Sequence, residues 1–142
     1  MGLKKPVKTV PSLDALIDRS ISEISSSSAT SIGAAAFYSC SVLTTANFPV
    51  ATSIGDSAFD SCSVLKSLLL RGNNVCTLSN ANAFNSTPIA SGTGYIYVPS
   101  ALVEQYKAAS KWSTYAAQFR ALEDYTVDGT ITGELDPSKV GV

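Results

Sequence analysis

The chain has 142 residues, enough for one domain with a single core. Only 15% of the residues are charged and the formal net charge is −1, so a nucleic-acid surface is not expected, because phosphate binding needs clustered basic side chains. No apolar run approaches the length of a membrane span, and no apolar stretch follows the first lysines as in an export signal. We therefore expect a chain made in a cytoplasm, without membrane insertion.

The first expected element is a short helix over Leu13–Arg19, with Ser12 as its N-cap. Leu13, Leu16 and Ile17 fall on one side of this helix. Because terminal coils of a repeat array need a cover, residues 1–20 are interpreted as an arm and a capping helix.

A block of fourteen residues then occurs twice, 22 positions apart. Thr30–Leu43 returns as Thr52–Leu65 with changes at three interior sites. A fixed period in the low twenties is typical of repeat proteins whose coils stack around one shared core. We therefore predict an α/β solenoid over residues 21–99, with one strand and one short helical turn in each coil.

Each coil is expected to supply a short strand whose alternate side chains point inward. The period places these inward residues in three columns: Ile21, Leu43 and Leu65; Ile24, Ala46 and Leu68; and Phe48 and Leu70, with Ser26 in the first coil. Gly33 and Gly55 follow where a tight turn is expected. Phe37 and Phe59 are predicted to stack in one aromatic column, each within a short helical turn.

A looser third coil is expected next. Its strand is predicted at Tyr95–Pro99, with Ile96 and Val98 inward, and its other apolar residues are Leu78, Ala83, Phe84 and Ile89.

Residues 100–122 are predicted to form a two-helix C-terminal cap. Ser100 is the expected cap of a helix over Ala101–Ala109, and a second helix runs from Ser113 or Thr114 to about Leu122. Its apolar stripe is Trp112, Tyr115 and Phe119.

Residues 123–142 are predicted to form a hairpin and a tail. Two short strands flank the tight turn Asp128-Gly129. The segment Gly133–Val142 is expected to be either mobile or bound to another molecule.

Three cysteines leave two readings open. Cys40 and Cys62 occupy the same place in successive coils and could form a disulfide, but buried thiols that act as small hydrophobic side chains are the favoured reading. Because the chain has no histidine and Cys76 stands apart, no metal or cofactor is expected.

Catalysis has little support in the sequence. Without histidine, a Ser-His or Cys-His pair is impossible. The acidic residues, among them Glu104 and Asp124, are scattered and give no sign of two carboxyl groups held across a cleft. We therefore do not expect an enzyme.

The strand residues that face away from the predicted core are the candidate binding residues. They form one row of Glu23, Thr45, Ser67 and Tyr95, and a second of Ser25, Asn47, Leu69 and Tyr97. Exposed tyrosines make good contact sites, because each has a rigid apolar body and a hydrogen-bonding tip. The alternative is that the C-terminal cap or the hairpin covers Tyr95 and Tyr97.

The repeat unit I-G-x-x-A-F-x-x-C-x-x-L-x-x-x-x-x-P resembles the BspA-like leucine-rich repeat family. The first copy carries it at Ile32, Gly33, Ala36, Phe37, Cys40, Leu43 and Pro49. The second copy carries it at Ile54, Gly55, Ala58, Phe59, Cys62 and Leu65, with Arg71 in place of the proline. The segments Tyr97-Val98-Pro99, Leu102-Val103, Tyr106-Lys107 and Trp112-Ser113 resemble the end of such arrays.

The resemblance implies a right-handed solenoid that adheres to proteins or cell surfaces. Short arrays without a leader also resemble structural proteins encoded by bacteriophages and prophages. The resulting hypothesis is a non-catalytic structural and binding module on a virion, whose partners are other proteins of the particle or of a host cell surface. Because two regular coils are few, we expect either that the caps contribute much of the core or that the chain associates with copies of itself or with a larger assembly. The alternative is a domain of a bacterial cell-surface adhesin.

Overall fold

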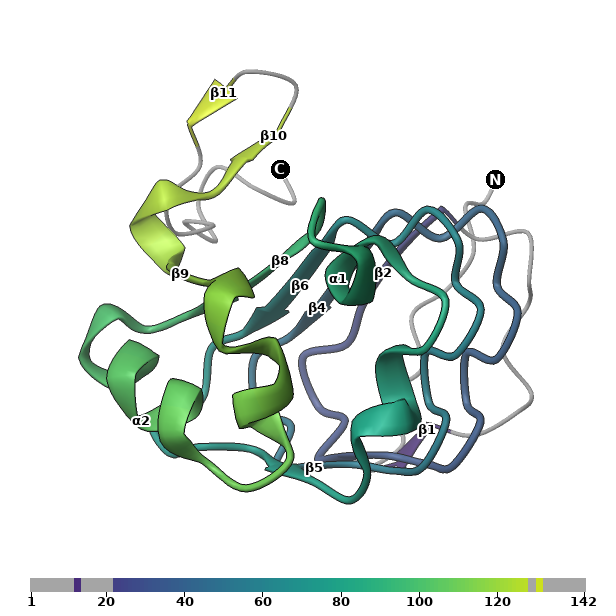
Figure 1. Ribbon diagram of the computed structural model, residues 1–142, viewed down its shortest axis with the longest axis horizontal. Helices are drawn as coiled ribbons and strands as arrows, with labels where there is room; N and C mark the ends of the chain where they lie inside the picture. The colour runs from purple at the N-terminus through teal and green to yellow at the C-terminus, as the bar shows by residue number, and fades with distance from the viewer. Residues whose placement is uncertain (1–11, 14–21, 128–129, 132–142) are drawn as a thin grey trace.

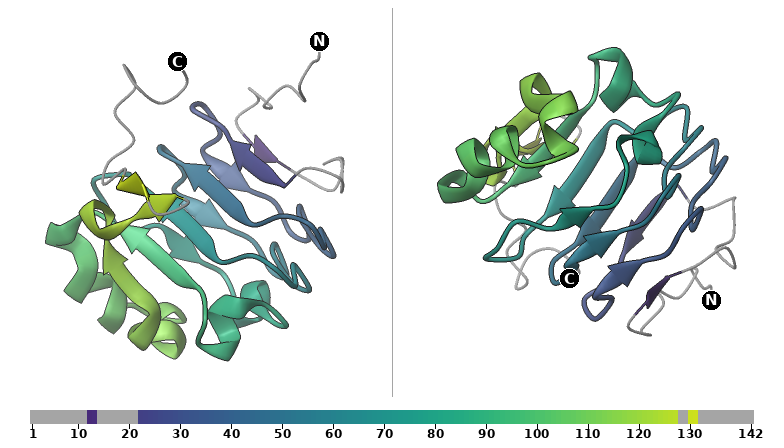
Figure 2. Two further views of the ribbon diagram at one scale, coloured as in Figure 1. Left: turned by 90° about the horizontal axis from the view of Figure 1, so that it is seen from above. Right: turned by 60° about the horizontal axis from the view of Figure 1, so that its bottom comes forward.

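The computed structural model describes residues 12–13, 22–127 and 130–131 (Figure 1). Its main body is a stack of coils with a parallel sheet on each of two sides. One sheet has five strands in the order β2-β4-β6-β8-β9, and the other has four in the order β1-β3-β5-β7. Figure 2 shows the coils following one another along the stack, with the C-terminal helices gathered at one end. This is the repeated α/β organisation that the period predicts.

The five-stranded sheet consists of β2 (Glu23–Ser25), β4 (Thr45–Phe48), β6 (Ser67–Leu70), β8 (Tyr95–Val98) and β9 (Phe119–Ala121). The first three strands pair in the 22-residue register, so that Ile24, Ala46 and Leu68 are neighbours, and Ile96 continues this column. All four side chains are buried. The inward column that the sequence predicts is therefore confirmed for these residues, whereas Ile21 lies outside the described part.

The four-stranded sheet is not anticipated by the sequence. It consists of β1 (Ser12–Leu13), β3 (Ser31–Ile32), β5 (Ser53–Ile54) and β7 (Thr77–Leu78). Ile32, Ile54 and Leu78 stand in register and are buried in the same core. Each strand has two residues, too few to show an alternating pattern, so only the stacking of the coils makes them strands.

The expected tight turn does begin at Gly55, whose carbonyl oxygen accepts from the Ala58 N–H at 3.2 Å, but the turn is not the reason for the glycine. Among the described glycines only Gly92 has a positive φ, at 97°. The Gly55 N–H instead donates to the carbonyl oxygen of Ile32 in the preceding coil, 2.8 Å away. A Cβ added at Gly55 would lie 2.7 Å from the backbone nitrogen of Ala34. Glycine is thus needed at this position because two coils approach closely there.

Gly55→Ala is expected to lower the free energy of unfolding by about 1–3 kcal/mol, because the new methyl group meets backbone that cannot move aside cheaply. Urea denaturation followed by circular dichroism measures this loss. Gly72→Ala is the matched control, since a Cβ there would be 3.8 Å from its nearest neighbour, the carbonyl oxygen of Pro49. Equal losses in the two variants would contradict the close approach at Gly55.

The segments around Phe37 and Phe59 are successive tight turns and not the expected helical turns. Left-handed φ angles of about 60° interrupt any helix, at Ala35 and Ser39 in the first copy and at the equivalent serines in the second. The turns also bond along the stack, where the Phe37 N–H donates to the carbonyl oxygen of Ala58 at 2.7 Å. Of the coils that the structure describes, only the third has a helical turn here, the 3-10 helix η1 (Ala81–Phe84).

The aromatic column is confirmed and is longer than predicted. The rings of Phe37 and Phe59 lie parallel, with centroids 5.1 Å apart, and Phe59 stacks on Phe84 at 5.5 Å. All three side chains are fully buried. Phe48 of β4 is tilted against both Phe37 and Phe59. One continuous hydrophobic core therefore runs through the three coils.

No disulfide joins Cys40, Cys62 and Cys76, and all three are buried, which confirms the favoured reading of the cysteines. The Cys62 thiol donates to the carbonyl oxygen of Phe37 at 2.9 Å, so it takes part in the contact between two coils.

Thiol titration of unfolded, non-reduced protein is expected to find three free cysteines, because no disulfide is present among them. The same reagent should react little with native protein, in which all three thiols are buried. A count of one in the unfolded chain would mean that Cys40 and Cys62 are bridged.

The C-terminal cap contains two helical segments, but the second ends at Gln118 and not near Leu122. Its first helix begins as the 3-10 turn η2 (Ser100–Leu102) and continues as α2 (Val103–Ala108), with Pro99 and not Ser100 at the cap position. The second is the kinked 3-10 helix η3 (Trp112–Gln118). Phe119–Ala121 is strand β9, which pairs with β8. We call residues 100–118 the lid. Its stripe residues Trp112 and Tyr115 are buried as expected.

The two ends of the chain are described only in part. Ser12 and Leu13 form β1 and pair with β3, so the predicted helix does not begin there, and residues 14–19 lie outside the described part. After η4 (Leu122–Asp124), β10 (Thr126–Val127) and β11 (Thr130–Ile131) pair antiparallel, as expected for the hairpin. Its turn and the segment Gly133–Val142 also lie outside the described residues. The remaining helix, α1 (Pro88–Ser91), precedes β8.

Candidate functional site

The outward side chains of the five-stranded sheet stand in the two rows that the sequence predicts. The first row joins Glu23, Thr45, Ser67 and Tyr95, which are direct partners across β2, β4, β6 and β8. Glu23 is exposed and the other three are half-buried. Parallel pairing in register fixes this alignment, because alternate residues of each strand point to the same side.

The second row joins Ser25, Asn47, Leu69 and Tyr97. Polar side chains of this row are engaged in hydrogen bonds within the protein. The Asn47 side-chain amide donates to the Ser25 hydroxyl at 3.0 Å. Arg71, directly after β6, donates from Nε to the Asn47 side-chain oxygen, also at 3.0 Å. The hydrogen bonds hold this row together across two coil contacts.

Leu69 is not an exposed contact residue, which corrects the sequence-based expectation. It faces away from the main core but is fully buried in a second, small cluster with Leu122, Tyr125 and the partly buried Tyr97. Because η4 follows β9 at the end of the sheet, its Leu122 reaches the outer side and covers Leu69. The alternative that a C-terminal segment covers the tyrosines is thus realised in part, at Tyr97.

Tyr95 and Tyr97 are both half-buried and form the aromatic end of the rows. Their ring centroids are 6.3 Å apart, and Tyr97 packs edge-on against Tyr125 at 5.0 Å. The Arg120 guanidinium lies over the Tyr95 ring, 4.5 Å from its centroid. Burial, followed by the nearby Tyr125 and Tyr95, raises the pKa of Tyr97, so this phenol stays neutral.

Arg120 is a residue of this surface that the sequence did not reveal. Its segment was expected to be helical, because Trp112, Tyr115 and Phe119 follow a helical spacing. The strand pairing of β9 with β8 instead places Arg120 beside Tyr97. Its Nη1 donates to the carbonyl oxygens of Ala117 and Phe119, which holds the guanidinium in position.

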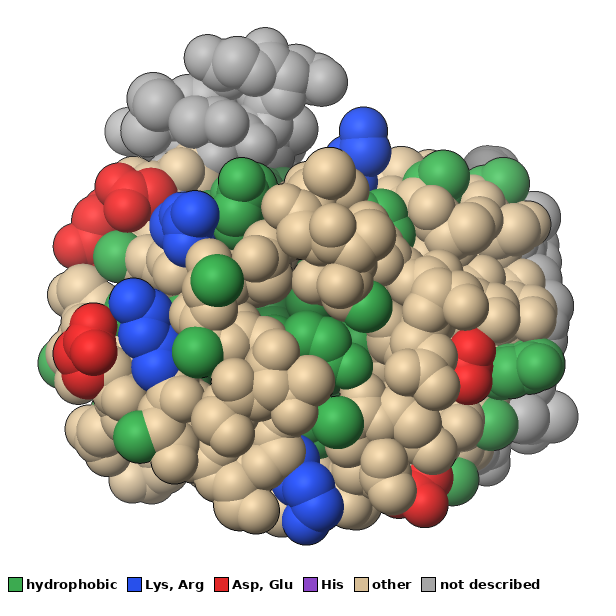
Figure 3. All heavy atoms as spheres, in the orientation of Figure 1, with side chains coloured by type: hydrophobic (Ala, Val, Ile, Leu, Met, Phe, Trp, Pro, Cys, Tyr) green, Lys and Arg blue, Asp and Glu red, His purple; other side chains and the backbone are tan. Residues whose placement is uncertain are grey.

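Charged side chains are sparse on the surface seen in Figure 3, where they stand mostly singly or as a neighbouring acid and base among uncharged groups. The ion pair between Lys107 and Glu104, at 3.6 Å, is an exposed contact within α2. Uncharged groups predominate in this view, and Ser, Thr and Asn are common among the polar residues of the sequence.

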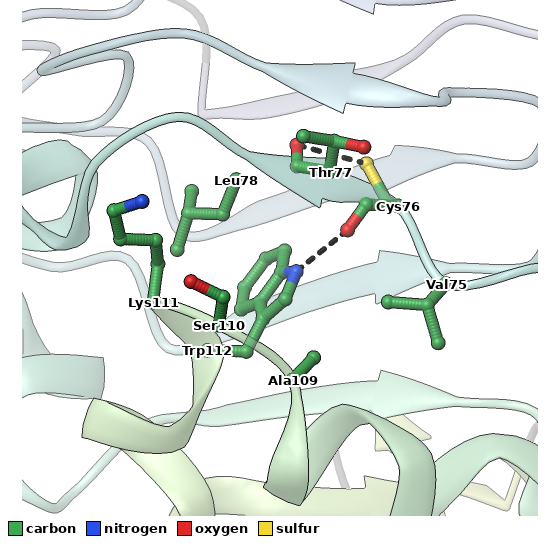
Figure 4. Close-up of a pocket in the computed structure, with 8 residues that line it drawn as sticks. All are labelled: Val75, Cys76, Thr77, Leu78, Ala109, Ser110, Lys111 and Trp112. Carbon is green, nitrogen blue, oxygen red and sulfur yellow. Dashed lines mark hydrogen bonds between the residues drawn. The ribbon is translucent and has the colours of Figure 1, made fainter.

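A recess of about 250 Å³ lies between the third coil and the lid (Figure 4). Its floor consists of Cys76, Leu78 and Trp112, each of which is buried. The Trp112 indole nitrogen donates to the Cys76 carbonyl oxygen at 2.6 Å, and the Cys76 N–H donates to the Tyr106 hydroxyl at 2.7 Å. The recess therefore lies where the lid packs against the third coil and forms hydrogen bonds with it.

Burial raises the pKa of the Cys76 thiol from 9.0 to about 12. Burial also raises the pKa of Tyr106 from 10.0 to about 12, although the hydrogen bond from the Cys76 N–H opposes the rise. Both groups are neutral in the folded protein at ordinary pH.

The protein is expected to lose stability as the pH rises above 9. In that range the unfolded chain releases the Cys76 proton and the folded chain keeps it, so the free energy of unfolding falls. Between pH 8 and pH 10 the expected loss is about 1–2 kcal/mol, measured by urea denaturation at both values. Cys76→Ala should reduce this loss, and an unchanged pH dependence in that variant would remove Cys76 as its cause.

The described residues contain no group of three or more acidic, cysteine or histidine side chains placed to hold a metal ion. Of the helices in the described part, none is both long and apolar enough to cross a membrane.

A family model described as "BspA type Leucine rich repeat region (6 copies)" matches residues 17–104. The match covers β2 to β8 and reaches the start of α2, and so includes both outward rows. No curated protein matches the chain.

Proposed function

Because the chain belongs to the BspA-type leucine-rich repeat family, we propose that it is a non-catalytic binding module. In this proposal the stacked coils are a short solenoid, and the outer face of the five-stranded sheet contacts proteins or a cell surface. Repeat proteins typically use the extended surface of stacked units in this way. Repeats of this family are typical of protein-binding and adhesin-like modules, which supports the proposed binding function.

The observation that carries the proposal is the alignment of outward side chains on a rigid base. Thr45, Ser67 and Tyr95 are held in register by parallel pairing, directly above a fully buried layer. Contact residues on a rigid element lose little conformational entropy when a partner binds. A tyrosine at the end of such a row offers a large apolar area together with a hydrogen-bonding group.

Binding of the full chain, fused to a fluorescent protein, to bacterial cells or isolated particle proteins tests this proposal. The double variant Thr45→Lys, Ser67→Lys places two long charged side chains on the face and should abolish binding. Tyr38→Ala is the control, because Tyr38 is exposed on a turn outside the five-stranded sheet. Equal binding by the double variant and the native chain would exclude this face.

The setting that we propose is a bacteriophage or prophage particle, where one end of the chain docks to the assembly and the solenoid points outward. A surface rich in hydroxyl and amide groups supports a place outside the cell, which also suits the alternative, a bacterial cell-surface adhesin domain. Mass spectrometry of purified particles separates the two. Absence of the chain from particles, together with its presence on the bacterial envelope, would favour the adhesin.

A further inference from the structure

The two outward rows differ in how many hydrogen bonds their side chains form within the protein. Asn47 is bonded on both sides in the second row, to Ser25 and to Arg71. In the first row, by contrast, the side chains of Glu23, Thr45, Ser67 and Tyr95 form no hydrogen bond or ion pair with any other described residue. Two hydroxyls, one phenol and one carboxylate therefore stand in line with their hydrogen-bonding capacity available.

The first row also has a definite shape. Neighbouring strands are about 4.8 Å apart, so the three spacings from Glu23 to Tyr95 span about 14 Å. Thr45 and Ser67 are short, half-buried side chains that form a low floor. Glu23 stands at one end, and the Tyr95 ring stands at the other with Arg120 over it.

We infer that the row Glu23, Thr45, Ser67 and Tyr95 binds a neutral, linear oligosaccharide. Sugar hydroxyls both donate and accept hydrogen bonds, which suits the hydroxyls of Thr45 and Ser67, and they donate to a carboxylate such as that of Glu23. Arg120 covers one face of the Tyr95 ring, so the apolar C–H side of a sugar ring would pack on the other face. A span of about 14 Å has room for a chain of two or three sugar rings.

A saccharide suits this row better than a protein does. The buried cores of protein interfaces are rich in apolar and aromatic side chains, and Glu and Ser are depleted there. The large hydrophobic side chains exposed in the described part are Tyr38, Val42 and Val50, none of which belongs to the five-stranded sheet. The inference rests on the proposed function, because it names the ligand of the same face.

Titration of the isotope-labelled full chain with maltotriose, cellotriose and chitotriose, followed by backbone amide NMR signals, tests the inference. We expect at least one trisaccharide to shift the signals of Thr45, Ser67 and Tyr95, with a Kd of about 1 mM or below. Tyr95→Ala should weaken this binding about tenfold. Thr45→Val keeps the side-chain shape and removes the hydroxyl, so it should weaken binding with no loss of stability. Tyr38→Ala should bind as the native chain does.

The inference is overturned if none of the three trisaccharides shifts these signals, or if Tyr95→Ala and Thr45→Val both bind as tightly as the native chain. A different result would show that the face binds a protein and not a saccharide. If cells still bind the chain in a saturating excess of the trisaccharide that shifts the signals, and Thr45→Lys, Ser67→Lys abolishes this binding, the face functions but recognises a protein. That result would overturn the saccharide and leave the proposed function standing.

Discussion

Phe59→Ala is expected to lower the free energy of unfolding by about 3–5 kcal/mol, the range for a buried aromatic ring replaced by a methyl group. The ring lies at the middle of the column, stacked on Phe37 at 5.1 Å and on Phe84 at 5.5 Å. Backbone hydrogen bonds between coils fix the segments that carry the neighbouring rings. These rings therefore cannot move far enough to fill the cavity. Small domains have about 5–15 kcal/mol of stability in all, so a large part of the fold's stability would be lost.

Urea denaturation followed by circular dichroism measures the effect of Phe59→Ala. Phe59→Leu keeps an apolar side chain of intermediate volume and should lose clearly less than Phe59→Ala. Tyr38→Ala removes an exposed ring one residue from the column position Phe37 and should change stability by less than about 0.5 kcal/mol. A loss below 1 kcal/mol in Phe59→Ala would show that the column does not hold the coils together.

The sequence predicts those parts of the fold in which one repeat copies another. The 22-residue period gives the register of β2, β4 and β6, the buried column through Ala46 and Leu68, and the stacking of Phe37 on Phe59. It does so because each coil repeats the environment of the one before, so equivalent residues must be spatial neighbours. The outward rows follow from the same register, and with them the positions of the candidate binding residues.

The four-stranded sheet, which joins equivalent residues such as Ile32 and Ile54, is missed because each strand is too short to show a pattern. The other features that the sequence does not predict arise from contacts between non-equivalent residues. Phe119–Ala121 becomes strand β9 because β8 offers it an open edge, although its apolar spacing is helical. Leu69 appears as an outward contact residue until Leu122, far along the chain, covers it. The left-handed φ angles at Ala35 and Ser39 lack a sequence signal, because neither residue is glycine or asparagine. Tertiary packing, and not the local sequence, determines each of these features.

The lid covers the C-terminal end of the repeats, and its contacts indicate that the repeats depend on it to fold. Its anchor is Trp112, which is buried and contacts Phe84 of the aromatic column, Tyr106 of α2 and Phe119 of β9, with ring centroids 5.4–5.8 Å apart. Tyr115 also packs edge-on against Phe84 and donates its hydroxyl to the carbonyl oxygen of Ala81. The lid therefore closes the core of the third coil. Terminal units of repeat proteins depend on such a cover.

Trp112→Ala is accordingly expected to cost about 3–5 kcal/mol and to unfold lid and repeats together in one transition, measured by circular dichroism in urea. Trp112→Phe keeps an aromatic ring but leaves the Cys76 carbonyl oxygen without the indole N–H, so it should cost about 1–3 kcal/mol. In native protein, Trp112→Ala should also let a thiol reagent reach Cys76, which the indole covers in the intact molecule. Two separate transitions in Trp112→Ala, with the repeats still folded after the lid is lost, would contradict this dependence. The coils would then be stable alone, and the aromatic column from Phe37 to Phe84 would be sufficient for the fold.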